Sequence, residues 1–164
     1  PLAPDDVDIN LDFIINQWTP PTLAVYKQEA SQVDFICRVI KNSQQRDIAV
    51  LHLKNQRIRE LHDLVGEKLN GSVPLELLRR GRFNFSRPSV KFCTLDSVKG
   101  LEFDVVILPN LSRDDYWVDR RNLTRLYVAM TRPRLDLVMI YPDGNGAPAI
   151  FDIPPDRFNR INLT

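Results

Sequence analysis

The chain has 164 residues, of which 43% are hydrophobic and 26% charged, and its formal net charge is +1. This length predicts one domain with a sizeable core, and the composition is that of an ordinary globular protein. The balanced charge excludes a uniformly basic nucleic-acid binder, so any basic surface must be local. No apolar run is long enough to span a bilayer and no signal peptide opens the chain, so we expect no membrane partner.

The first 21 residues differ in composition from the rest of the chain. They are rich in proline and aspartate, and we interpret residues 1–21 as an N-terminal arm or linker that enters the domain. The chain begins with proline rather than methionine, which predicts that it is part of a longer protein.

The cysteine and histidine content does not suggest a metal site. The chain has two cysteines, Cys37 and Cys93, and two histidines, His52 and His62. Cys37 falls on the apolar face of a predicted helix and Cys93 in a predicted strand, which favours buried free thiols over a disulfide. These four residues form no recognisable ligand motif, so we predict no metal site on this chain.

The first half of the chain alternates between strand and helix patterns. Residues 22–27 predict a short strand, and residues 29–42 predict a helix with apolar side chains at i, i+3, i+4 and i+7. Residues 47–53 form a continuous apolar run, which is typical of a strand buried on both faces. A second helix is predicted at residues 55–69, and the turn-forming residues 70–74 end it.

The second half continues this alternation. Residues 89–95 and 103–109 predict two further strands of the buried type, and the connection between them is too short for a full crossover helix. Residues 119–131 predict a helix, again with apolar side chains at i, i+3, i+4 and i+7. Residues 135–141 predict the last strand.

The alternation of helices with buried strands defines the predicted fold. It implies an α/β fold with a mostly parallel sheet and helices on both faces. We assign the domain to residues 22–141, with the least regular part, residues 70–88, as a short insertion and residues 142–164 as a C-terminal tail. Binding chemistry in such sheets lies outside the carboxyl ends of the strands, where we expect residues 94–102 and 53–55.

The chain lacks the usual phosphate-binding loop of nucleotide hydrolases. The pattern G-x-x-x-x-G-K-[ST] does not occur, and the six glycines are scattered. Residues 113–115 (RDD) follow a strand several residues too late for a Mg²⁺-holding acidic pair, so we interpret them as solvated loop charge. We therefore expect that this chain alone does not hydrolyse ATP.

Arg132 lies between the last predicted helix and Pro133, which ends that helix. One interpretation is an arginine that satisfies the last helical carbonyl groups and the helix dipole. The other is an arginine that reaches a phosphate held elsewhere, because a guanidinium between two buried elements is costly unless an anion meets it. An arginine supplied from outside the P-loop domain increases the rate of phosphoryl transfer by a factor of roughly 10³–10⁵.

The segment after the strand at residues 89–95 carries groups that suit phosphates. The Thr94 hydroxyl and the backbone amides after it suit a nucleic-acid phosphate. Lys99 and Gly100 offer a cation and a flexible amide, and Glu102 offers an acceptor for a ribose hydroxyl. Each residue alone is more simply interpreted as loop charge, but their combination with Arg132 favours a nucleotide-dependent function.

Three segments resemble motifs of a known family. TLDSVKGLEFDVVIL (residues 94–108) resembles motif V of UvrD/PcrA/Rep-type superfamily 1 helicases, where T-x-H-x-x-K-G-L-E-F-x-x-V is usual. RLYVAMTRPR (residues 125–134) resembles motif VI, usually L-x-Y-V-A-x-T-R-A, and DIAVLHLKNQRIRELHDLV (residues 47–65) more weakly resembles motif IV. Their order and spacing match the second RecA-like domain of these helicases over roughly residues 22–141.

This resemblance implies a RecA-like three-layer fold and an ATP-dependent function. In the family, ATP and Mg²⁺ are bound mainly by the N-terminal RecA-like domain, which carries the P-loop and is the expected partner domain. Arg132 matches the motif VI finger at the γ-phosphate. Lys99, Gly100 and Glu102 match motif V positions near the ribose and phosphates, and His52 stands where an aromatic residue usually stacks on adenine.

The resemblance also implies single-stranded DNA as a partner. Thr94 matches the position that contacts a phosphate of the strand, and Asp96 and Ser97 belong to the same predicted contact loop. A carboxylate at residue 96 is unfavourable there, because the family has a histidine at this position and a carboxylate repels a phosphate.

The predicted insertion carries a second set of candidate nucleic-acid contacts. In RRGRFNFSR (residues 79–87), arginines such as Arg80 and Arg82 alternate with aromatic residues such as Phe83. Cations that follow the backbone and rings that stack on bases suit a single strand. A hairpin with buried rings and solvated arginines explains the same pattern equally well.

The sequence therefore predicts the C-terminal motor domain of a UvrD-like superfamily 1 DNA helicase, which supplies the arginine finger and part of the single-stranded DNA grip. We expect a cytoplasmic protein with a role such as DNA repair, and the sequence leaves repair, recombination and conjugation open as its pathway. Leu53, which aligns with a second γ-phosphate arginine of motif IV, and Asp96 motivate an alternative. In that alternative, the chain is a catalytically degenerate RecA-like module that binds nucleic acid or docks another protein.

Overall fold

The computed structural model describes residues 19–78, 85–116 and 119–164. Most of the predicted N-terminal arm, residues 1–21, lies outside these ranges. Among the described residues, no helix combines the length and the apolar character needed to cross a bilayer.

The centre of the described structure is a seven-stranded sheet in which all neighbouring strands are parallel. The strand order is β3-β4-β2-β5-β6-β1-β7. All strands therefore begin at one edge of the sheet, here the amino edge, and end at the opposite carboxyl edge. The bounds are β1 Thr22–Tyr26, β2 Ile48–His52, β3 Leu75–Leu77, β4 Val90–Thr94, β5 Phe103–Leu108, β6 Pro133–Pro142 and β7 Asn159–Asn162.

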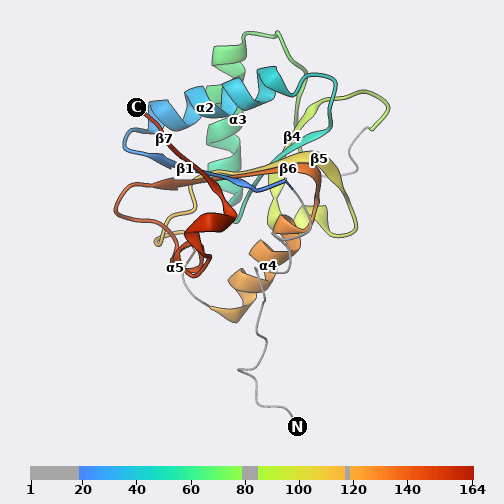
Figure 1. The fold of residues 1–164 in the computed structure, drawn as a ribbon. Helices are drawn as coiled ribbons and strands as arrows, with labels where there is room; N and C mark the ends of the chain where they lie inside the picture. The colour runs from blue at the N-terminus through green and yellow to red at the C-terminus, as the bar shows by residue number, and fades with distance from the viewer. Residues whose placement is uncertain (1–18, 79–84, 117–118) are drawn as a thin grey trace.

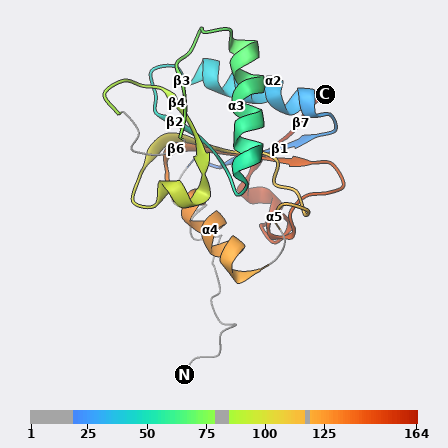
Figure 2. The ribbon, with the colours of Figure 1, turned by 180° about the vertical axis from the view of Figure 1, so that it is seen from behind.

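Helices cover both faces of this sheet, as the two opposite views show (Figures 1 and 2). α2 and α3 lie on one face, and α4 and the short α5 lie on the other. The predicted α/β fold with three layers is confirmed. The helical elements are α2 Glu29–Asn42, α3 Asn55–Leu69, α4 Arg120–Met130, α5 Pro148–Phe151 and the 3-10 turns η1 Leu95–Val98 and η2 Pro155–Arg157.

The α2 and α3 layer packs on the sheet through the apolar stripes that the sequence predicts. Ile36 and Ile40 of α2 and Ile58 and Leu61 of α3 have no exposed surface. They pack against β-strand side chains such as Val50, which is also fully buried. Truncating one of these isoleucines to alanine would cost about 2–5 kcal/mol, because the cavity left behind adds to the lost hydrophobic transfer energy.

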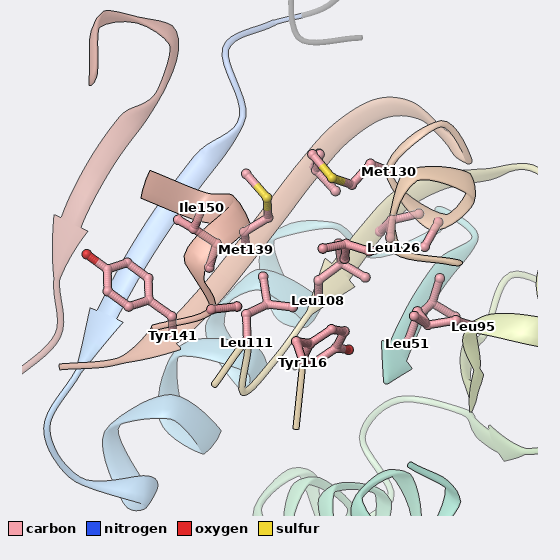
Figure 3. Close-up of a cluster of buried hydrophobic side chains, with 14 of the residues drawn as sticks. Leu51, Leu95, Leu108, Leu111, Tyr116, Leu126, Met130, Met139, Tyr141 and Ile150 are labelled. Carbon is pink, nitrogen blue, oxygen red and sulfur yellow. The ribbon is translucent and has the colours of Figure 1, made fainter. Parts of the chain in front are cut away.

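The second core lies between the sheet and the α4 and α5 layer (Figure 3). Leu126 and Met130 of α4 and Ile150 of α5 pack with Leu108 of β5 and Met139 of β6. The buried residues of α4, Leu126, Ala129 and Met130, lie in its C-terminal half, so this core holds the end of α4 that leads into Arg132.

The helix and strand bounds agree closely with those predicted, and the main shift concerns Pro133. β6 starts at this proline, whereas the sequence suggested a strand starting at residue 135. Pro133 pairs with Phe103 of β5, next to a register shift between Phe103 and Val105. A proline is tolerated at the first residue of a strand because its missing N–H is not needed there. α4 therefore passes into β6 through Thr131 and Arg132 alone.

Some elements carry no sequence signal that we recognised. β3 lies in the predicted insertion and pairs with β4, and β7 lies in the predicted C-terminal tail and pairs with β1. All four residues of β7 are exposed, so no apolar pattern marks this strand. The sheet thus extends beyond residue 141, while the division of the chain into arm, domain, insertion and tail stays a prediction.

Both cysteines are buried and free, so the prediction of buried thiols is confirmed. Burial raises the pKa of Cys93 to about 12, because the thiolate would lose its hydration inside the core. Cys93 thus behaves as a small apolar side chain in the core next to α4.

Candidate functional site

Arg132 lies at the junction of α4 and β6. The helix begins with Asp119, whose side chain accepts a hydrogen bond from the Asn122 amide at 2.7 Å, and it ends at Met130. The Thr131 hydroxyl donates to the Val128 carbonyl at 2.7 Å, which closes the last turn. The chain then enters the sheet at Pro133, so the backbone of Arg132 is fixed by the core on both sides.

The Arg132 guanidinium donates hydrogen bonds to neutral oxygens. Nε lies 3.1 Å from the Val128 carbonyl oxygen, and Nη2 lies 3.0 Å from the Thr131 hydroxyl. Nη1 lies 3.4 Å from the Leu101 carbonyl oxygen. Within the described residues, no carboxylate pairs with this partly buried cation. The interpretation of Arg132 as an arginine that satisfies the last helical carbonyl groups therefore holds in part. The side chain bonds to the Val128 carbonyl, but these contacts do not neutralise its charge.

A neighbouring arginine shows the contrast. Arg134, two residues along the chain, is exposed, and its Nη2 lies 2.9 Å from Asp104 Oδ1. Arg134 therefore has an anion within the chain, and Arg132, at the same edge of the sheet, has none among the described residues.

The structure brings Gly100 and Glu102 close to Arg132. The Leu101 carbonyl between them accepts from Arg132, and the Phe103 amide donates to the Arg132 carbonyl at 2.9 Å. Gly100 has φ +77°, a conformation that favours glycine, and Glu102 is exposed. We call Arg132 with residues 100–102 the Arg132 corner.

The position of this corner in the sheet corrects one expectation. Arg132 and Glu102 precede β6 and β5, so they lie at the amino edge, and not outside the carboxyl ends of the strands. The reason is topological. β4 and β5 are parallel, and residues 95–102 must therefore return from the carboxyl end of β4 to the amino end of β5.

Thr94 and Ser97 remain at the carboxyl end of β4, where the prediction places them. The Thr94 and Ser97 hydroxyls lie 3.0 Å apart across the start of η1. Asp96, in the same turn, pairs with Arg125 of α4, with Oδ2 and Nη2 2.9 Å apart. The predicted motif V residues are thus divided between the two ends of the η1 connection.

A groove of about 460 Å³ lies between η1 and the first turns of α4. Its lining residues are Leu95, Asp96, Lys99, Arg120, Arg121, Thr124, Arg125 and Val128. Four of these are cations and one is a carboxylate, so the groove is locally basic on a chain of nearly balanced charge. Lys99, predicted as a nucleotide contact, lies here on the same groove as the α4 arginines.

His52 is in a different environment from the one predicted. Its ring is fully buried, it meets the Tyr116 ring edge-on at 5.2 Å, and its Nδ1 accepts from the Lys54 amide at 3.0 Å. Its Nε2 lies 3.5 Å from Asp115 Oδ2. This conformation leaves no face of the imidazole exposed for adenine, because the segment after β5 covers it.

Asp115 is the centre of a polar network at the carboxyl edge. Its carboxylate lies 2.5 Å from Lys54 Nζ and accepts from Asn110 Nδ2 at 2.7 Å, and Asn110 in turn accepts from the Tyr26 hydroxyl. The hydrogen bond from His52 and then the one from Lys54 hold the pKa of Asp115 well below its ordinary value. We call these five residues, Asp115, His52, Lys54, Asn110 and Tyr26, the Asp115 network.

Burial and the nearby Glu29 carboxylate raise the pKa of Tyr26 to about 12, so its hydroxyl remains a donor at neutral pH. Glu29 is itself paired with Arg57 at 2.5 Å. The sequence suggested solvated loop charge around residues 113–115, and for Asp115 the structure corrects this to a structural anion. Its role could not be seen from the sequence because its partners come from distant strands.

Leu53, which aligns with the motif IV arginine, packs as a partly buried residue against the core next to α4. Its amide donates to the Tyr116 hydroxyl at 3.2 Å. An apolar side chain in this place offers no phosphate contact, so any anion that Arg132 meets is not shared with residue 53.

The candidate contacts Arg80, Arg82 and Phe83 lie outside the described residues. The next aromatic residue, Phe85, is described and is 45% exposed. Its ring lies 6.1 Å from that of Phe103, and the buried Lys91 ammonium lies 4.8 Å from its centroid. The end of the predicted insertion therefore packs on the first residue of β5.

Comparison with protein families identifies one match. Residues 67–144 match the model of the UvrD-like helicase C-terminal domain. These residues include both the Arg132 corner and the basic groove. A search of curated protein sequences finds no match.

Solved structures with a similar fold include helicases. The C-terminal domain of a possible DNA helicase from Lactobacillus plantarum WCFS1 aligns with a TM-score of 0.74 and 19% identity, over 93% of this chain and 89% of that one. A chain from the structure of S. cerevisiae dbp5 bound to nup159, gle1, IP6 and ADP aligns with a TM-score of 0.61 and 15% identity, over 88% and 44%. The PRRSV helicase aligns with a TM-score of 0.52 and 8% identity, over 93% and 32%. These low identities establish the fold and nothing finer.

Proposed function

We propose that this chain, which contains a UvrD-like helicase C-terminal domain, supplies Arg132 as an arginine finger to ATP held by an N-terminal RecA-like domain of the same protein. The observation that carries the proposal is the environment of Arg132. Its guanidinium is held at the edge of the sheet by the core on both sides, yet among the described residues it meets neutral oxygens and no carboxylate.

The chemistry of the side chain fits this role. A guanidinium is always charged and presents donors in a planar fork that matches phosphate oxygens. Hydrogen bonds to carbonyl oxygens hold it in place, and a triphosphate offers stronger, charge-assisted bonds. The cation can therefore exchange neutral partners for an anionic one when the two domains close.

Gly100 and Glu102 support a nucleotide at the same corner. Gly100 leaves open space around its backbone, since a side-chain carbon at this position would meet no atom within 4 Å. The exposed Glu102 carboxylate is an acceptor of the kind that a ribose hydroxyl requires. In the proposed closed state, Arg132 meets the γ-phosphate and Glu102 orients the sugar.

Magnesium is assigned to the partner domain. The family resemblance assigns Mg²⁺ to the domain that carries the P-loop. Mg²⁺ would supply charge neutralisation on the phosphates when bound there. The contribution of this chain is the cation of Arg132 and the positioning of Glu102.

The proposed cycle couples this contact to single-stranded DNA. Charge that develops on the phosphates during hydrolysis is stabilised by Arg132, and loss of the γ-phosphate removes the anion that holds the cleft closed. Thr94 and Ser97, at the other end of the η1 connection, contact a phosphate of the strand through their hydroxyls. Opening and closing then alternate the grip on the strand and move the protein along it.

Replacing Arg132 by alanine in the full-length protein tests the proposal. We expect DNA-stimulated ATP hydrolysis to fall by roughly 10³–10⁵-fold, with ATP binding changed little, because the finger acts on the transition state. Arg134→Ala is the matched control, because it removes the same charge at the same edge from a side chain already paired with Asp104. Unchanged turnover in Arg132→Ala, or an equal loss in Arg134→Ala, would refute the finger.

A second candidate function is a RecA-like docking or nucleic-acid-binding module without turnover. Leu53 favours it, because its side chain packs against the core where a second phosphate-binding arginine is expected. The same assay separates the two functions. A full-length protein that binds single-stranded DNA but shows no DNA-stimulated ATP hydrolysis is such a module.

A further inference from the structure

The groove between η1 and α4 has cations on both sides. Lys99 comes from the η1 side, and Arg121 and Arg125 come from α4. Lys99 and Arg121 are exposed, and neither has an ion-pair partner among the described residues. Cations on two sides of an open groove suit a linear polyanion, which can pass between them.

Asp96 is the one carboxylate that lines this groove among the described residues, and it pairs with Arg125. The side chains of Asp96 and Arg125 are 47% and 23% exposed. An ion pair of this exposure is weak, because water and salt screen it, so an external anion can displace the carboxylate from the guanidinium. Asp96 therefore occupies the place that a phosphate would take on Arg125.

We propose that this groove binds the phosphate backbone of single-stranded nucleic acid through Lys99, Arg121 and Arg125, and that Asp96 is an internal anion that competes with phosphate for Arg125. The proposal rests on the proposed function and extends it to a contact path along α4. Thr94, the predicted strand contact, immediately precedes η1, whose residues Leu95 and Asp96 line the groove.

The lining of the groove defines the kind of contact. Its lining, within the described part of the chain, contains no aromatic side chain, so it offers charges to phosphates and no ring for base stacking. Binding is therefore independent of base sequence. Lys99, which the family resemblance assigned to the nucleotide, is assigned here to the strand because it shares the groove with Arg121 and Arg125.

Competition by Asp96 gives a prediction of unusual sign. Asp96→Asn removes a negative charge and leaves Arg125 free for a phosphate. We expect the affinity for oligo(dT) to rise by roughly 3- to 10-fold at about 0.1 M salt. The dependence of log K on log salt should become steeper by about 0.7, the value for one added contact to a single strand.

The experiment measures fluorescence anisotropy of labelled oligo(dT) bound to the full-length protein without nucleotide, as a function of salt. Arg121→Ala should weaken binding by roughly 3- to 10-fold and make the salt dependence shallower by about 0.7. Arg59→Ala is the control, because Arg59 is an exposed arginine on α3, on the opposite face of the sheet. It should leave both quantities unchanged.

Three outcomes would overturn the groove assignment. One is an Asp96→Asn protein that binds oligo(dT) no more tightly than the parent, and another is an equal loss in Arg121→Ala and Arg59→Ala. The third is a change in the affinity for poly-glutamate in these variants with no change in the affinity for oligo(dT). That result would identify an acidic protein segment as the occupant of the groove. Asp96→Asn preserves side-chain size, so a melting curve that matches the parent keeps the test valid even if Arg121→Ala folds poorly.

This test is separable from that of the arginine finger. Oligonucleotide affinity without nucleotide does not depend on Arg132, whereas ATP turnover does. If Arg132→Ala leaves ATP turnover intact while Asp96→Asn tightens DNA binding, the arginine-finger proposal is refuted and the groove proposal stands.

Discussion

The Asp115 network and the Arg132 corner differ in the partners that surround a charged side chain. Asp115 at the carboxyl edge has donors from Lys54 and Asn110, and the buried His52 ring beside it. Arg132 at the amino edge donates hydrogen bonds to neutral oxygens, and no carboxylate among the described residues forms an ion pair with it. The charge of Asp115 is paired within the chain, whereas the charge of Arg132 has no carboxylate partner among the described residues.

This difference separates a structural role from a functional one. A charge whose partners lie within the chain stabilises the fold, so its removal lowers the free energy of unfolding. A charge held in position without an anionic partner costs stability in the isolated domain, and that cost is recovered when a ligand supplies the anion. The comparison predicts that Arg132 variants lose activity and that Asp115 network variants lose stability.

After that of Arg132→Ala, the largest expected effect is that of Arg132→Lys. Lysine keeps the charge but lacks the planar fork of donors, so we expect DNA-stimulated ATP hydrolysis to fall by at least about 10²-fold. The free energy of unfolding should change by less than about 1 kcal/mol, because the side chain's partners in this chain are neutral. Steady-state ATPase assays and urea unfolding measure the two quantities. A lysine variant that keeps most of its turnover would show that charge alone suffices.

Asp115→Asn should have the opposite profile. The amide cannot match the charge-assisted bonds from Lys54 and Asn110, so we expect a loss of about 1–3 kcal/mol in the free energy of unfolding at neutral pH. The pH dependence follows from the lowered pKa of Asp115 in the folded state. Its contribution is present above the ordinary carboxyl pKa of about 4 and is lost as the pH falls below it.

The gap in stability between the parent and Asp115→Asn should therefore narrow as the pH falls from about 7 towards about 3. Urea unfolding at several pH values measures this gap. A gap that stays constant over this range would mean that the network does not depend on the Asp115 charge.

The smallest effect is expected for Tyr116→Phe. The Tyr116 side chain is buried and its hydroxyl accepts from the Leu53 amide, so removal of the hydroxyl leaves that amide without a partner. We expect a loss of about 1 kcal/mol in the free energy of unfolding and no change in ATP turnover. A thermal melt and an ATPase assay check the two. A large loss of turnover would show that the segment over His52 takes part in the nucleotide site.

Much of the fold follows from local sequence patterns. The α2 stripe indicates a helix packed on a sheet through one face, because its apolar side chains recur with the helical period. The short continuous apolar run of β2, followed by a helix pattern, is typical of a strand buried on both faces. β7 has four exposed residues and no such pattern, so its place beside β1 is decided by pairing with a distant strand. The place of the short β3 is likewise decided by its pairing with β4.

The candidate site was predicted in part. Arg132 and Glu102 were found through their motifs, and the structure brings them to one corner through the Leu101 carbonyl. The burial of His52 and the pairing of Asp96 with Arg125 had no signal in the sequence. Each depends on side chains far apart in the chain, whose distance is not set by any local spacing.

The sequence by itself determined the helices α2, α3 and α4, most of the strands, the parallel α/β class and the identity of the cation at residue 132. These features depend on hydrophobic periodicity and on short motifs, which act over a few residues. The tertiary structure alone decided which charges find partners. Asp115 acquires Lys54 and His52 because β2 and the segment after β5 meet at the carboxyl edge, whereas Arg132 at the amino edge meets neutral oxygens, since the fold brings it no carboxylate among the described residues.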